Sequence, residues 1–143
     1  MSDETLPAFV SLNVGDEVAA RDVTFTRDTL VRYAAASGDF NPIHYNDAFA
    51  QSVGLDGVIA HGMLTMGVGA SVVEEWAGAG NVVDYQARFT RPIPVPALAR
   101  AVVRVVAVVG ALNHDVKQAR IDVTVTVDGA KVLGKAQALV DCA

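Results

Sequence analysis

The stretch HGMLTMGVGASVVEEWAG, residues 61–78, decides the fold of this chain. It is apolar nearly all round and stops at a glycine, a pattern typical of a helix buried inside a domain. Gly67 and Gly69 are costly there, because glycine weakens a helix by about 1 kcal/mol relative to alanine. Small side chains make sense if a sheet approaches the helix backbone closely. We therefore predict a buried helix over residues 61–77 that packs against a sheet.

The second half of the chain supplies that sheet. Residues 119–127 alternate apolar and polar side chains, which is the period of a half-buried strand. Asp-Gly at 128–129 is a hairpin signal. The strands expected in this half, all rich in β-branched residues, are 82–89, 99–110, 119–127 and 131–140.

The first half reads mainly as helix and loop. A short strand is predicted at 22–26, followed by a helix that begins with Thr26 as its N-cap and by a second short helix near 46–53. One long antiparallel sheet wrapped around one central helix is the simplest packing of all these parts. The expected fold class is α+β.

Composition limits the partners and the location of the protein. A chain of 143 residues, 52% hydrophobic and 19% charged, fits one domain with a sizeable core, and its net charge of −5 argues against a nucleic-acid partner. One cysteine, Cys142, excludes an intramolecular disulfide and suits a reducing compartment. The N-terminus, MSDETLPAFV, lacks a secretory pattern, and the apolar run 58–73 is shorter than the roughly 20 residues of a membrane helix. We expect a cytoplasmic protein without a membrane span.

A loop after the first helix, SGDFNPIH at residues 37–44, places a carboxylate and an imidazole close together in sequence. The Asn-Pro pair stiffens the chain there, so Asp39 and His44 would lie on a preformed loop. Directed at one water, such a pair can share two proton transfers, as the addition of water to a double bond or its reversal requires. A structural alternative stays open, in which Asp39 caps the next turn and a backbone carbonyl satisfies His44.

Gly62 stands at the expected start of the central helix. Backbone N–H groups lack intrahelical partners at that position, and the helix dipole is positive. Without a side chain, Gly62 would let a substrate oxygen approach its N–H closely, as in a carbonyl-binding or oxyanion site. The alternative is that this glycine only allows a tight turn into the helix.

These motifs resemble a known family. Tyr33, SGDFNPIH and Ala50 are similar to the hydratase-2 motif of the MaoC-like, (R)-specific enoyl thioester hydratases and dehydratases, and AHGMLTMG at 60–67 lies where that family begins its central helix. With RFTRPIPVP at 88–96, they resemble most closely the catalytic B-type subunit of actinobacterial (3R)-hydroxyacyl-ACP dehydratases. Two departures, Ala36 and PVPALA at 94–99 in place of a Gly-Asp turn, leave the Asp-His pair intact.

The resemblance implies a single hot-dog domain over residues 1–143 and a substrate carried as a pantetheine thioester on CoA or acyl carrier protein. It implies that Asp39 and His44 hold and activate water, and that the Gly62 N–H polarises the thioester carbonyl. It also implies that Ser37 and Asn41 orient the loop, and that no metal or redox cofactor is needed. The implied assembly is a homodimer, or a heterodimer with a degenerate hot-dog subunit that supplies much of the acyl tunnel.

Two other functions remain as alternatives. The first is a hot-dog acyl thioesterase, although hydrolysis has no use for a proton donor at Cα. The second is a non-catalytic subunit that binds thioesters or supports a heterodimer, although such a subunit need not keep both Asp39 and His44.

Several further residues are ambiguous from sequence. We expect His61 to make a structural hydrogen bond, and the histidines, His44, His61 and His114, do not show metal-ligand spacing. The possible acyl-tunnel residues, which core packing explains equally well, are Phe40, Leu64, Met66 and Val68. The cations that could meet CoA phosphates or an acidic carrier protein, but could equally be solvated, are Arg88, Arg91, Arg104, Lys117 and Arg120.

Overall fold

A computed structural model describes residues 6–143. Residues 1–5, part of the N-terminal segment in which we expect no secretory signal, lie outside that range. The described chain forms one antiparallel sheet in the order β1-β3-β4-β6-β2, with a short β5 paired to β4. The strands are β1 (Glu17–Phe25), β2 (Val82–Phe89), β3 (Ala101–Asn113), β4 (Gln118–Val127), β5 (Ala130–Lys131) and β6 (Leu133–Asp141). The helices are α1 (Arg27–Ser37), α2 (Asp47–Ser52) and α3 (Gly62–Ala77), with 3-10 turns η1 (Phe9–Ser11) and η2 (Pro42–His44).

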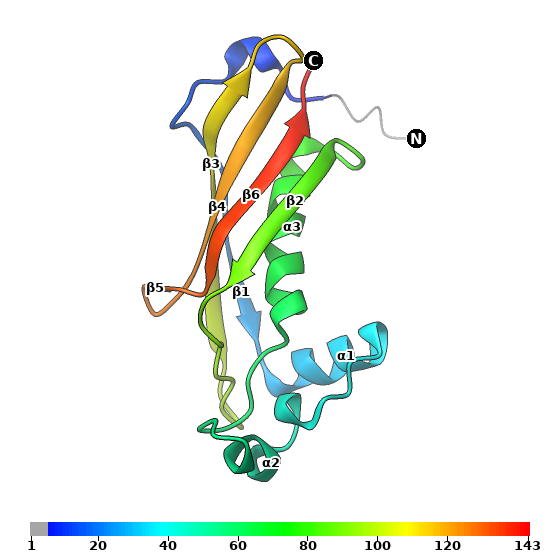
Figure 1. Ribbon diagram of the computed structural model, residues 1–143, viewed down its shortest axis with the longest axis vertical. Helices are drawn as coiled ribbons and strands as arrows, with labels where there is room; N and C mark the ends of the chain where they lie inside the picture. The colour runs from blue at the N-terminus through cyan, green and yellow to red at the C-terminus, as the bar shows by residue number, and fades with distance from the viewer. Residues whose placement is uncertain (1–5) are drawn as a thin grey trace.

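The sheet curves along one side of α3, while α1 and α2 lie beyond one end of the sheet and the C-terminus lies at the other (Figure 1). Alternate residues of the central strands face α3 and form the core, which confirms the alternation read in residues 119–127. The fully buried side chains of β3 and β4 in this layer are Val103, Val105, Ala107, Val109, Ala119, Ile121 and Val125. The predicted α+β architecture is therefore confirmed. None of the helices within residues 6–143 is long and apolar enough to cross a membrane.

Helix α3 has the predicted bounds but not the predicted burial. It starts after His61 and ends at Gly78, whose backbone φ of 88° lies in the left-handed region. The sheet covers only one of its sides, so a stripe containing Met63, Gly67 and Ser71 is exposed. The expectation of burial all round is wrong for that stripe, because apolar composition does not reveal how far one sheet can wrap around a helix.

Close approach of the sheet to the helix occurs at Gly69. A Cβ atom on Gly69 would lie 2.6 Å from the hydroxyl oxygen of Tyr85, a residue of β2. That hydroxyl is buried without a hydrogen-bond partner in residues 6–143, and burial raises the pKa of Tyr85 to about 12. Gly67 makes no such contact, since a Cβ there would have no described atom within 4 Å. The packing reason proposed for the small residues thus applies to Gly69 and not to Gly67.

Strand boundaries differ from the sequence expectation most clearly in β1, in β3 and in the last strand. β3 spans Ala101–Asn113 and not 99–110. β1 begins at Glu17 rather than near residue 22, because pairing with β3 continues through residues of weak strand propensity. The last predicted strand, 131–140, is interrupted at Val132. The N–H of Val132 donates to the Val125 carbonyl, and its own carbonyl accepts from the Thr90 N–H. The Asp-Gly hairpin is confirmed, with positive φ values of 50° and 78° at residues 128 and 129 that suit a type I′ turn.

The two glycines of α3 allow a matched test of this packing. In Gly69→Ala the new methyl group overlaps the Tyr85 hydroxyl, so we expect a loss of about 1–3 kcal/mol in the free energy of unfolding. Gly67→Ala gains helix propensity in open space and should raise the same free energy by roughly 0.5–1 kcal/mol. Urea denaturation of both variants measures the difference, and equal shifts would contradict the close contact.

Candidate active site

The loop that carries Asp39 is held in shape by its own side chains. Ser37 Oγ accepts from the Asp39 N–H at 3.2 Å, and Asp39 Oδ1 accepts from the Asn41 N–H at 3.1 Å. Asn41 Oδ1 then accepts from the Ile43 N–H at 3.2 Å. This relay uses one carboxylate oxygen of Asp39 and leaves Oδ2 to face His44. Ser37 and Asn41 therefore do contact the loop backbone on either side of Asp39.

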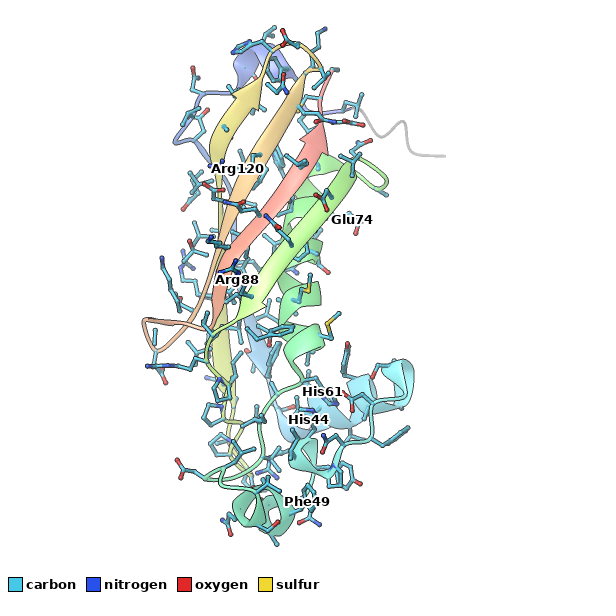
Figure 2. All side chains as sticks on the ribbon, in the orientation of Figure 1. His44, Phe49, His61, Glu74, Arg88 and Arg120 are labelled. Carbon is cyan, nitrogen blue, oxygen red and sulfur yellow. The ribbon has the colours of Figure 1, made fainter. Side chains whose placement is uncertain are left out.

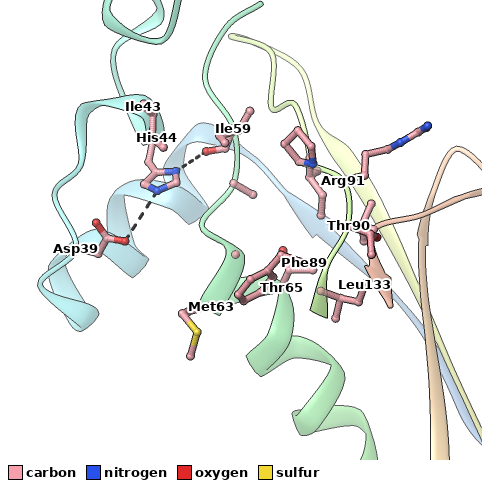
Figure 3. Close-up of a pocket in the computed structure, with 15 residues that line it drawn as sticks. Asp39, Ile43, His44, Ile59, Met63, Thr65, Phe89, Thr90, Arg91 and Leu133 are labelled. Atoms are coloured by element: carbon pink, nitrogen blue, oxygen red, sulfur yellow. Dashed lines mark hydrogen bonds and ion pairs between the residues drawn. The ribbon is translucent and has the colours of Figure 1, made fainter. Parts of the chain in front are cut away.

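His44 is buried, and its ring is fixed by the chain that precedes α3. Its Nδ1 lies 2.7 Å from the carbonyl oxygen of Ile59, and the Ile59 N–H donates to the Ile43 carbonyl at 3.1 Å. A carbonyl can only accept, so Nδ1 carries a proton, and the tautomer that this hydrogen bond selects has its lone pair on Nε2. Figure 3 shows this nitrogen directed toward Asp39.

Asp39 and His44 face each other without a direct hydrogen bond. His44 Nε2 and Asp39 Oδ2 are 3.9 Å apart, and the Asp39 side chain is 50% exposed. One water molecule can contact both atoms at about 2.8 Å each. The pair predicted from the 37–44 loop is therefore brought together around a site that suits a single water.

His61 contacts both members of this pair. It is 1% exposed, its Nε2 lies 3.2 Å from the backbone carbonyl of Asp39, and its ring stacks on that of His44 with centroids 3.8 Å apart. Tyr33 covers another side of the ring, edge-on at 4.7 Å. Burial lowers the pKa of His61, with a smaller contribution from the neighbouring His44. The structural hydrogen bond expected for His61 is present, and burial favours the uncharged form of its ring.

Asp39, His44 and His61 also form a cluster whose potential ligand atoms lie within 4.8 Å of one another. Sequence spacing did not reveal this cluster, and His114 lies elsewhere, edge-on to Phe9. A metal ion would need nitrogen lone pairs that converge at about 2.0–2.1 Å, whereas stacked rings direct theirs side by side. The geometry suits hydrogen-bonded imidazoles better than a metal centre. Catalysis without a metal or cofactor stays a prediction.

A cavity of about 470 Å³ adjoins the pair. Gly62 borders it as the first residue of α3, and the ring of Phe89 lies 3.1 Å from where a Gly62 Cβ would be. No group within residues 6–143 accepts a hydrogen bond from the Gly62 N–H. Further residues in the wall include Ile43, Met63, Thr65, Phe89, Arg91 and Leu133.

The proposed tunnel residues are not part of this wall. Leu64 and Val68 pack against the core, and Phe40 is 60% exposed at the surface. Sequence reasoning missed Met63 and Phe89, which do border the cavity. Met63 follows Gly62 directly, so the helix start could have indicated it, whereas Phe89 depends on the pairing of β2 with β6 and had no local signal.

An ion pair joins the segments around the site. Arg27 at the start of α1 donates to both carboxylate oxygens of Asp47 at the start of α2, at 2.8 and 3.0 Å. Asp47 also accepts from the Val58 N–H at 2.9 Å. The Val58 N–H first, and then Arg27, hold the pKa of Asp47 below its usual range. The loop with Asp39 and His44 is thus anchored on both sides.

Comparison with known proteins identifies the family. The sequence model of a protein family, the MaoC like domain, matches residues 10–131 of this chain. The chain belongs to the MaoC-like family. Its structure is similar to that of a MaoC-like dehydratase, with a TM-score of 0.93 and 35% identity over 98% of this chain and 43% of that one. It is also similar to an (R)-hydratase from A. caviae involved in PHA biosynthesis, with a TM-score of 0.81 and 27% identity over 93% and 98% of the two chains. These likenesses confirm the hot-dog fold and the family resemblance.

Two curated relatives extend far beyond this chain. It is 44% identical to 3-hydroxyacyl-thioester dehydratase X of Mycobacterium tuberculosis over 68 residues. This match covers 48% of this chain and 24% of the relative. The chain is 35% identical to fatty acid synthase subunit beta of Saccharomyces cerevisiae over 88 residues. This match covers 59% of this chain and 4% of the relative. The chain therefore spans a quarter or less of each of these relatives.

Asp47 gives the anchoring ion pair a pH dependence. A folded-state pKa below the usual 3.8 means that the charged carboxylate stabilises the fold above that pH, and that this contribution is lost as the pH falls through the lowered pKa. Asp47→Asn should therefore lower Tm at pH 7, and the difference from the parent protein should disappear in acid. Thermal unfolding from pH 7 down to about pH 2 measures this, with the decline expected to begin near pH 4.

The matched control for this test is Asp56→Asn, a change to an exposed carboxylate that forms no ion pair within residues 6–143. Its Tm should follow the parent protein at every pH. An Asp47→Asn deficit that persists unchanged at about pH 2 would contradict a role for the charge.

Proposed function

We propose that this chain catalyses the reversible hydration of an enoyl thioester, as a (3R)-hydroxyacyl thioester dehydratase and (R)-specific enoyl thioester hydratase of fatty-acid metabolism. The observation that carries the proposal is the 3.9 Å gap between Asp39 Oδ2 and His44 Nε2 beside the cavity that Gly62 borders. Similarity to a 3-hydroxyacyl-thioester dehydratase in sequence and to an (R)-hydratase in structure supports it. The same arguments favour an enzyme of the hydro-lyase class.

In the hydration direction, Asp39 and His44 hold one water against the double bond. The water oxygen bonds to C3 of the acyl chain while one of its protons passes to the pair. The pair delivers a proton to C2, so that O–H ends on C3, H ends on C2, and the protein returns to its starting state. Two oriented proton-transfer groups of this kind contribute typically 10²–10⁴-fold each to rate.

In the dehydration direction the same groups work in reverse. The pair removes the proton from C2 and a proton passes to the departing hydroxyl, which leaves C3 as water. Negative charge that develops at C2 spreads onto the thioester carbonyl oxygen. The Gly62 N–H, at the positive end of α3, can donate to that oxygen, and a donor of this kind is worth about 2.7–4 kcal/mol in comparable sites.

A thioesterase uses the same fold differently, because its water must attack the carbonyl carbon. The His44 lone pair and the Asp39 carboxylate provide two proton-transfer groups, and hydrolysis has no use for a proton donor at C2. The two groups therefore favour hydration over thioester cleavage. Release of free thiol on mixing with an acyl-CoA would identify the thioesterase.

Incomplete coverage of the site supports an assembly of two hot-dog units. The Asp39 side chain is half exposed, Met63 and Phe89 are 59% and 56% exposed beside the cavity, and β2 ends the sheet. A second hot-dog unit, either another copy or a degenerate subunit, would close the acyl tunnel. The single buried cysteine, Cys142, and the fatty-acid synthesis named for relatives support a cytoplasmic location.

Charge near the cavity supports binding of an anionic carrier, either CoA or acyl carrier protein. Among the described cations, Arg104 and Arg120 pair with Asp22 and Asp122. Arg91 lines the cavity, and Arg88 lies on the outer face of the sheet (Figure 2); neither has an ion-pair partner in residues 6–143.

The first experiment is hydration of a trans-2-enoyl-CoA, followed by the loss of its conjugated absorbance. The parent protein should be active, and Asp39→Asn should lower kcat by about 10²–10⁴-fold, because the amide cannot accept a proton. Asp56→Asn makes the same chemical change outside the cavity and should leave kcat unchanged. Equal and measurable rates for the parent and Asp39→Asn would refute the mechanism.

If the parent protein is inactive with the CoA ester, the assay is repeated with the enoyl group on acyl carrier protein and with a degenerate hot-dog subunit added. Activity under these conditions identifies the missing carrier or partner. Inactivity in all of them would argue for the non-catalytic alternative.

The carrier is tested with a second set of variants. Arg88→Gln and Arg91→Gln should each raise KM by about 2- to 5-fold with little change in kcat, because exposed charges contribute up to about 1 kcal/mol. Lys117→Gln, in the β3–β4 turn at the opposite end of the molecule (Figure 1), is the matched control and should not alter KM. The increase in KM of the two arginine variants should become smaller at high salt. An increase that does not depend on salt would exclude electrostatic attraction of the carrier.

A further inference from the structure

Asp39 has few connections outside its own loop. Within residues 6–143, its backbone N–H and Oδ1 bond to Ser37 and Asn41 of the same loop, and its carboxylate makes no direct hydrogen bond to His44. The hydrogen bond that ties the Asp39 backbone to another part of the chain is the one between its carbonyl and Nε2 of His61. The position of this half-exposed carboxylate thus depends on a buried imidazole.

The same imidazole also supports the other half of the pair. The ring of His61 lies face to face with that of His44, at 3.8 Å between centroids and 22° between planes. His44 is held by its Nδ1–H bond to Ile59, but a single hydrogen bond allows a ring to tilt about it. The stacked ring of His61 blocks that tilt on one face.

We propose that His61 is a positioning residue that sets the gap between Asp39 and His44. It acts on Asp39 through the Nε2–H donated to the Asp39 carbonyl and on His44 through the stacked ring. This role rests on the proposed hydration function, since the gap matters only if one water must contact both side chains. No atom of His61 needs to touch the substrate.

The surroundings of His61 suit a neutral ring in this role. The groups that face it are the Asp39 carbonyl and nearby carboxylate, the ring of His44 and the ring of Tyr33. Its burial favours the uncharged form, so the ring donates from Nε2 while Nδ1 carries the lone pair. A neutral neighbour also lets His44 take up a proton during the reaction without repulsion from a second imidazolium.

Two variants separate the hydrogen bond from the stack. His61→Gln keeps a nitrogen donor in place of Nε2 but loses the ring, whereas His61→Phe keeps a ring but cannot donate. We expect His61→Phe to lower kcat by about 10- to 100-fold at a KM near that of the parent, because a displacement of about 1 Å can cost 10²-fold. His61→Gln should recover part of this loss. An unchanged kcat in His61→Phe, or equal losses in both variants, would overturn the proposal.

A readout that does not depend on activity separates this proposal from the proposed function. Nitrogen NMR of the histidine-labelled parent should find the proton of His61 on Nε2 and that of His44 on Nδ1. In His61→Phe, amide hydrogen exchange at Asn41 should become faster while exchange at Val103, in the sheet core, stays unchanged. A proton on Nδ1 of His61, or unchanged exchange at Asn41, overturns the positioning role even if the protein is an active hydratase. Inactivity of the parent with every enoyl thioester refutes the hydratase function instead.

Discussion

The hydrogen bonds between the loop at residues 39–44 and the segment at residues 59–61 are the constraint on which the site depends. The Ile59 N–H and carbonyl bind the Ile43 carbonyl and His44 Nδ1, and His61 binds the Asp39 carbonyl. These contacts select the tautomer of His44 and bring its free nitrogen to face Asp39. Without them the two side chains would still lie near each other in sequence, but the ring of His44 would have no hydrogen bond to set its orientation toward Asp39.

Helix α3 connects this site with the core. Its first residue, Gly62, borders the cavity, and two turns later Gly69 receives the Tyr85 hydroxyl from the sheet. Both glycines leave room for a close neighbour, which is the Phe89 ring at Gly62 and the Tyr85 hydroxyl at Gly69. The sheet therefore contacts α3 two turns from the end of the helix that borders the cavity.

Much of this arrangement follows from local sequence. The bounds of α3, the Asp-Gly hairpin and the facing of Asp39 and His44 were all readable, because caps, turns and an Asn-Pro pair act over a few residues. The stacking of His61 on His44 and the approach of Phe89 to Gly62 were not readable, since both join segments that only the folded sheet and helix bring together. The exposed stripe of α3 was missed for the same reason.

The relay of Ser37, Asp39 and Asn41 has a consequence for how the chain can vary. Each of these side chains accepts from a backbone N–H two residues ahead, so the curvature of the loop is encoded largely by its own side chains, while Ile59 and His61 hold it against the rest of the chain. Distant parts of the sheet can then exchange one apolar residue for another without moving Asp39, while alanine at position 37 or 41 would release it. Tolerance to substitution should therefore change abruptly at the ends of this loop instead of declining gradually with distance from the cavity.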